Sequence, residues 1–142
     1  MRTLVRFLNG NRGAALLLGG IYCLARGVAY LPIGGPPDEL PIGLQLISAN
    51  FPIAVWGGVW LTVAAGCIYR AFTRDDALAW GFLIGLMFGW GVAYLLGYTV
   101  SAVEHRPSRD WFSATAYILP ALIFLTLLRT SRGRSNAPNR DA

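Results

Sequence analysis

The composition of this 142-residue chain lies outside the range of soluble globular proteins. Hydrophobic residues make up 55% of it and charged residues only 13%, whereas charged residues are about 25% of a soluble domain. All twelve basic residues are arginines, which stay protonated in proteins, and the formal net charge is +5. We therefore expect an integral membrane protein whose arginines contact the membrane surface, and we expect no nucleic-acid partner.

Four apolar segments follow one another along the chain, and they cover residues 13–31, 51–69, 77–100 and 111–128. Each is close to the ~20 residues that a helix needs to cross a bilayer, and a backbone in lipid must satisfy its own hydrogen bonds. We predict an all-α integral membrane fold in which residues 1–128 form an antiparallel bundle of four transmembrane helices. Residues 129–142 are basic and polar, and we expect them to be a disordered tail.

The arginines flanking these segments predict the orientation of the chain. If the N-terminus is cytoplasmic, Arg106 and Arg109 are the flanking arginines on the outer side. The cytoplasmic side then holds Arg2, Arg6, Arg12, Arg70, Arg74, Arg129, Arg132, Arg134 and Arg140. Cytoplasmic flanks carry the excess of positive charge in membrane proteins. We therefore predict that both termini are cytoplasmic and that their arginines contact anionic lipids of the inner leaflet.

Two connections carry local signals. Residues 32–50 contain four prolines with Asp38 and Glu39, so a rigid turn followed by a loop is expected. An alternative is that the apolar stretch 42–47 lies on the outer membrane surface as a short segment. Between the second and third segments, Thr73 followed by Asp76 resembles a helix N-cap with an acidic partner.

Small residues recur at every fourth position of three segments. The third segment has the clearest pattern, with Gly81, Gly85, Gly89, Ala93 and Gly97. Weaker versions occur in the first segment as Ala15, Gly19, Cys23 and Gly27, and in the second as Ala54, Gly58, Thr62 and Gly66. This spacing lets helix backbones approach closely in lipid. Two interpretations stay open: the small residues close the protein's own bundle, or they form contacts between copies in a homo-oligomer.

Arg26 is the one charged residue inside an apolar segment. Its long side chain could extend to the outer interface and pair there with Asp38, Glu39 or Glu104. The other interpretation is a place in a substrate or ion pathway, because ionisable residues within membranes often mark such pathways.

No pattern in the sequence indicates catalysis or metal binding. The single histidine, His105, has only Glu104 beside it, which is too few ligands for a metal site. Asp75 and Asp76 fit a turn and a cap, since no base or further carboxylate accompanies them on that side. The serines lack a nucleophile-elbow context, and a chain without lysine has no phosphate-binding loop with its lysine. We expect neither an enzyme nor a cofactor.

The arrangement of glycines and tryptophans resembles a group of small four-helix, holin-like membrane proteins encoded by phages of actinobacteria. The resemblance covers about residues 12–128 and rests on diffuse positions: Arg12, Gly13, Leu17, Leu18, Gly19, Gly20, Gly27, Pro52, Trp56, Gly57, Trp60, Gly66, Asp76, Phe82, Trp90, Gly91 and Tyr94. It implies a multi-pass protein of the bacterial host's inner membrane and a context among lysis genes.

Three functions follow from these expectations. The first is a holin-like protein that oligomerises through Gly81 to Gly97 and permeabilises the host inner membrane during lysis. The second is a non-permeabilising interaction or superinfection-exclusion protein that uses residues 32–50. The third is a small-solute channel or carrier, which needs a polar file through the bundle. Its candidate residues are Tyr22, Arg26, Thr62, Tyr94 and Thr99.

Overall fold

A computed structural model describes residue 8, residues 10–33 and residues 40–135 of the chain, with side chains to residue 129. Its described part contains five helices and no strand: α2 (Gly10–Ala29), α3 (Ile42–Ser48), α4 (Ile53–Arg70), α5 (Ala77–Val103) and α6 (Asp110–Ser135). The predicted all-helical class is confirmed.

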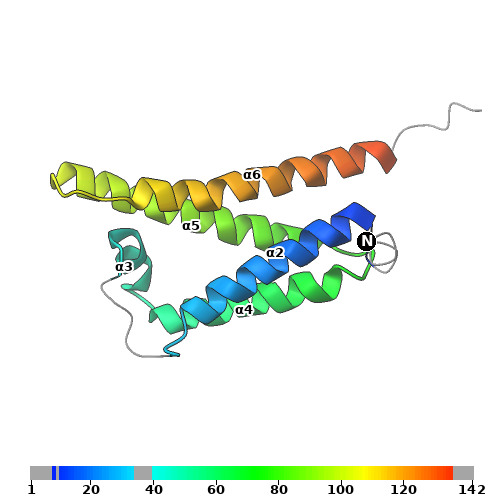
Figure 1. The fold of residues 1–142 in the computed structure, drawn as a ribbon, viewed down its shortest axis with the longest axis horizontal. Coiled ribbons are helices and arrows are strands. Elements are labelled where there is room, and N and C mark those ends of the chain that lie inside the picture. Colours follow the sequence, from blue (N-terminus) through cyan, green and yellow to red (C-terminus); the bar gives the residue numbers. More distant parts are fainter. Residues whose placement is uncertain (1–7, 9, 34–39, 136–142) are drawn as a thin grey trace, which may run out of the picture.

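Four of these helices, α2, α4, α5 and α6, are long and apolar enough to cross a membrane. They coincide with the four predicted apolar segments to within a few residues, apart from the longer C-terminal end of α6. In Figure 1, α2 and α5 run in one direction while α4 and α6 run in the other. The N-terminal end of α2 and the C-terminal end of α6 therefore lie at one end of the bundle, and α3 lies at the opposite end, which we call the α3 end (Figure 1).

The bundle is built from two tightly packed pairs, α2 with α4 and α5 with α6. Glycines set the close approach within each pair. A Cβ added to Gly20 would lie 3.2 Å from the carbonyl oxygen of Ala64, and one added to Gly27 would lie 3.1 Å from that of Gly57. On the other pair, Gly91 of α5 lies against Ile118 of α6. Larger side chains at these positions would hold the helices apart.

The α3 segment was expected to be loop, and this expectation is wrong. Residues 42–48 form a seven-residue helix that packs on α5. The reason is that Gly43 and Gly97 both lack side chains, so the backbones of α3 and α5 meet directly. Leu44 is buried in the same contact, at 3% exposure, which adds hydrophobic burial to the backbone packing.

The C-terminal tail was expected to be disordered from residue 129, but α6 continues as helix to Ser135. It also passes through Pro120 without a break. The next proline is Pro138, so none ends the helix near Leu128, and extending a helix that has already nucleated is easy. Residues 136–142 lie outside the described part of the chain.

The expected Thr73 cap on the third helix is also wrong. The hydroxyl of Thr73 donates to the carbonyl oxygen of Arg70, at the end of α4. Asp76 holds the N-cap position of α5 without a side-chain cap hydrogen bond. Its carboxylate instead accepts from Arg12 at 2.6 Å and from the indole N–H of Trp80 at 3.2 Å. Asp76 is 4% exposed, and a buried carboxylate is stabilised more by a charged donor than by a backbone N–H.

Candidate functional site

The small-residue stripe of α5 divides into an open part and a closed part. A Cβ added to Gly81, Gly85 or Gly89 would meet nothing within 4 Å. Ala93 and Gly97, farther along the same helix, are covered by α3, whose Gly43 lies against both. Among the described residues, three of the five positions of the stripe are therefore open and two are covered by α3.

The weaker stripes of the first two segments differ from each other: the glycines of the α2 stripe are covered and those of the α4 stripe are open. On α2, Gly19 faces Leu83 of α5 and Gly27 faces Leu61 of α4, so both serve packing within the chain. On α4, Gly58 and Gly66 face open space. Thr62 lies between them, and its hydroxyl donates to the carbonyl oxygen of Gly58 at 2.9 Å. The hydroxyl donor of Thr62 on the open face of α4 is therefore already paired.

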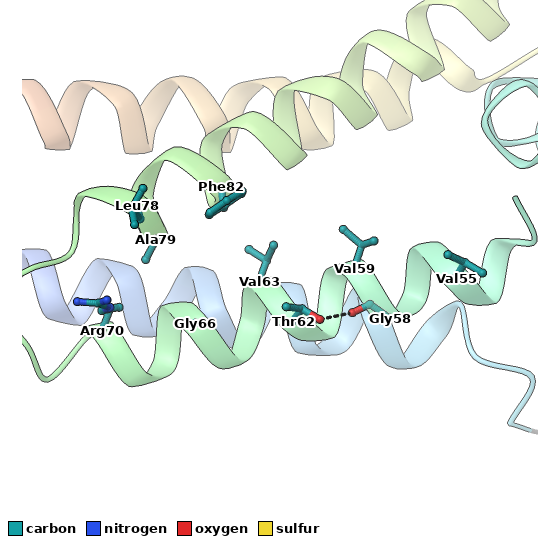
Figure 2. A pocket seen from close by; sticks show the side chains of 10 residues that line it. All are labelled: Val55, Gly58, Val59, Thr62, Val63, Gly66, Arg70, Leu78, Ala79 and Phe82. Atoms are coloured by element: carbon teal, nitrogen blue, oxygen red, sulfur yellow. Dashed lines mark hydrogen bonds between the residues drawn. The ribbon is translucent and has the colours of Figure 1, made fainter. Parts of the chain in front are cut away.

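The open faces of α4 and α5 meet in a groove of about 640 Å³, shown in Figure 2. Helix α5 rises away from α4 toward the α3 end, so the two helices form the walls of a wedge (Figure 2). The lining is mostly aliphatic and small, and Arg70 lies at one end, where it pairs with Asp75 at 2.9 Å. The lining residues are Val55, Gly58, Val59, Thr62, Val63, Gly66, Arg70, Leu78, Ala79 and Phe82.

A second hollow of about 450 Å³ lies between the same two helices, beside α3. Gly85 and Gly89 line it together with Trp56 of α4 and Ile47 of α3. We call the two hollows together the α4–α5 groove. It is apolar and elongated, and its glycines permit close approach of another backbone, so it suits a helix or an acyl chain more than a reacting substrate.

Arg26 points into the bundle. Its Nε donates to the hydroxyl of Tyr22 at 3.3 Å, and its guanidinium carbon lies 4.8 Å from the ring centre of Tyr117 on α6. The expected pairing with Glu104 is wrong, because Glu104 binds Arg106 at 3.2 Å. The ring of Tyr117 attracts the cation by its negative face and so draws the side chain inward. Asp38 and Glu39 lie outside the described residues.

Arg26 contacts two members, Tyr22 and Tyr117, of an aromatic cluster built from four helices. The hydroxyl of Tyr30 lies 3.0 Å from that of Tyr117 and accepts from the indole N–H of Trp90 at 2.9 Å. Tyr94 stacks on Tyr117 with ring centres 5.6 Å apart. Trp60 is fully buried and packs against Trp90 and Tyr117. We call this set, with Tyr22 and Trp56, the Arg26 cluster.

Sequence reasoning overlooked most of this cluster. Tyr22, Arg26 and Tyr94 were singled out as polar channel candidates, and the structure brings these three together. The other two candidates, Thr62 and Thr99, are exposed, and their hydroxyls donate to carbonyl oxygens of their own helices. A usable signal was the position of Tyr117, which lies inside its segment and not at its end, since aromatic residues in membrane helices concentrate at the ends of the helices.

Polar residues also occur elsewhere in the described parts of the chain. Those parts contain no group of three His, Cys, Asp or Glu residues that could hold a metal ion. His105 is exposed in the turn between α5 and α6, where its φ of 55° is left-handed. The geometry offers two features, an apolar groove and a cationic aromatic cluster, and both are suited to binding.

A comparison of the chain with protein-family models, curated proteins and solved structures finds no match in any of the three.

Proposed function

We propose that this chain is a holin-like phage membrane protein that assembles through the α4–α5 groove and permeabilises the inner membrane of its bacterial host. The observation that supports this proposal is the set of open glycines on α4 and α5, where no side chain or backbone of the described chain approaches. The proposal includes the predicted orientation, with both termini cytoplasmic and their arginines on anionic inner-leaflet lipids.

The argument for assembly is energetic. A glycine in a helix costs roughly 0.5–1 kcal/mol relative to alanine, so open glycines weaken α4 and α5 in the isolated chain. In lipid, helices associate by van der Waals packing and not by a hydrophobic drive, and glycine removes the side chain that would hold a partner away. A second copy seated in the groove offsets this cost with close backbone contact.

Assembly through the groove allows growth beyond a pair. If the groove of one copy receives a different face of the next copy, the contact is head-to-tail and repeats to form rings or open arrays. A membrane protein that grows into such arrays can open a lesion once enough copies have gathered. This is the step that would release a cytoplasmic lysin or collapse the membrane potential.

The test is inducible expression in a bacterium that also carries a cytoplasmic endolysin, with culture density and a membrane-potential dye as readouts. The variant Gly85→Leu adds a side chain to the groove at an exposed position where its Cβ would meet nothing within 4 Å, so it should insert normally and lose permeabilisation. The matched control is Ala116→Leu, which adds similar bulk at an exposed position of α6. We expect the control to lyse cells as the wild type does.

Other results would select the other candidate functions. Normal growth with wild-type protein verified in the membrane would favour the interaction or superinfection-exclusion protein. An ion or solute flux that survives Gly85→Leu but disappears in Arg26→Gln would favour the channel or carrier, because the Arg26 cluster would then form the pathway. Lysis that persists in Gly85→Leu would remove the groove from the mechanism.

A further inference from the structure

The charge of Arg26 is not balanced by any carboxylate of the described chain. The ion pairs among the described residues join Arg12 to Asp76, Arg70 to Asp75 and Arg106 to Glu104. Arg26 instead contacts neutral groups, the hydroxyl of Tyr22 and the rings of Tyr22 and Tyr117. A half-buried charge without a counter-ion is costly, which indicates that an anion belongs beside it.

Arg26 and its cluster present hydrogen-bond donors that have no acceptor among the described residues. A guanidinium carries five N–H donors, and Tyr22 accepts from one of them. Trp60 is fully buried beside Tyr22 and Tyr117, and its indole N–H has no partner among the described residues. An acceptor that is itself anionic would satisfy both the charge and the donors.

The position of Arg26 in the bundle restricts the source of this anion. Arg26 lies three residues from the end of α2, so about 5 Å separates it from the α3 end of that helix at 1.5 Å per residue. Tyr117 lies about 10 Å into α6 by the same rise. This depth is just inside a membrane interface, where the headgroup phosphates of lipids lie.

The bundle leaves a route to Arg26 from the lipid side. Helix α2 packs mainly on α4 and α6 mainly on α5, with few contacts between α2 and α6. Arg26 and Tyr22 are both half-buried at this junction.

We propose that Arg26 and the donors of its aromatic cluster form a binding site for an anionic phosphoryl group, the headgroup phosphate of a lipid lodged between α2 and α6. The planar guanidinium fork binds phosphoryl oxygens in a bidentate manner, which a lysine ammonium does not. The stacked rings hold that fork in place before the lipid arrives, so less side-chain entropy is lost on binding.

The experiment measures thermal unfolding of the purified full chain in neutral maltoside micelles during titration with phosphatidylglycerol, phosphatidylcholine or sodium phosphate. Phosphatidylglycerol should stabilise the wild type most, because ligand bound only to the folded state raises its stability. Arg26→Gln should weaken the apparent affinity by on the order of tenfold, which corresponds to about 1.4 kcal/mol. The apparent affinity of Arg26→Lys should lie between those of the wild type and Arg26→Gln.

The control variant is Arg106→Gln, which removes an arginine at the α3 end whose side chain is 67% exposed and paired with Glu104. It should keep the wild-type lipid response, which separates a built site from general attraction of anionic lipid. Equal stabilisation of wild type and Arg26→Gln by phosphatidylglycerol would overturn the proposal. Equal stabilisation of the wild type by sodium phosphate would support the phosphoryl site and assign it to a free anion.

Lipid-free stability provides an independent readout. If Arg26 carries an unbalanced charge, Arg26→Gln in neutral micelles should be at least as stable as the wild type, since a desolvated charge has been removed. If Asp38 or Glu39 neutralised Arg26, Arg26→Gln would destabilise the lipid-free protein, and the double variant Asp38→Asn/Glu39→Gln would do the same. That result would overturn the proposal.

Discussion

Helix α5 carries glycines in two environments, and the comparison between them says the most about this protein. Gly91 and Gly97 are enclosed by α6 and α3, whereas Gly81, Gly85 and Gly89 face open space on the same helix. All five have the same chemistry, and four of them share one four-residue spacing. The spacing of small residues therefore identifies surfaces suited to close approach, while the partner of each surface depends on where the other helices lie.

The largest loss of stability is expected for Gly97→Leu, which changes one of the enclosed glycines. A Cβ at Gly97 would collide with the backbone of Gly43 and lie 2.8 Å from a carboxylate oxygen of Asp110. Backbone atoms cannot move aside as a flexible side chain can, so we expect α3 to detach and the free energy of unfolding to fall by about 3 kcal/mol. Denaturant titration followed by circular dichroism measures the loss. An unfolding curve equal to that of the wild type would show that α3 does not pack on α5.

A somewhat smaller loss is expected for Gly27→Leu, which acts on the α2–α4 pair. The new side chain would meet Leu61, and its Cβ would lie 3.1 Å from the carbonyl oxygen of Gly57. Leu61 can give way but the carbonyl cannot, so we expect a loss of about 2 kcal/mol. The double variant Gly27→Leu/Leu61→Ala, compared with both single variants in the same titration, should recover part of this loss. Strictly additive effects would contradict the contact.

A smaller effect is expected for Gly19→Ala, because its neighbour is the tip of one flexible side chain. The added Cβ would lie 2.5 Å from a methyl carbon of Leu83, which is otherwise fully buried. Rotation of Leu83 relieves most of the overlap, and we expect a loss of about 1 kcal/mol. The measurement is the thermal unfolding of Gly19→Ala, compared with that of Leu18→Ala, which changes an exposed neighbouring residue. An equal shift in both variants would argue against the packing of α2 on α5.

The smallest effect on stability, and the largest on assembly, is expected at the open glycines. Gly85→Leu and Gly58→Leu add side chains at positions where an added Cβ would meet nothing within 4 Å, so the free energy of unfolding should change by no more than about 0.5 kcal/mol. Self-association should nevertheless be lost, because the new side chains occupy the α4–α5 groove. Crosslinking in membranes measures self-association, and Ala116→Leu is the matched control. Oligomers that persist in both glycine variants would place any interface on another face.

Hydropathy was sufficient to locate the four long helices, and the reason is physical. Lipid offers no hydrogen-bond partners, so an apolar stretch of spanning length has to form a helix whatever its neighbours do. The predicted segment 77–100 and the observed Ala77–Val103 differ by three residues at one end. At α3 and in the first residues of the tail the expectation failed, because contacts with α5 or continuation of α6 decided the structure there.

The sequence by itself determined that this chain has four apolar helices, which faces of them carry small residues, and which residue is charged within an apolar segment. Each of these depends on one segment and on its hydration or backbone geometry. Only the tertiary structure decided that Gly97 is covered while Gly85 is open, and that Arg26 points toward Tyr117 and not toward Glu104. Those outcomes depend on contacts between residues distant in the chain, which a spacing pattern within one helix does not contain.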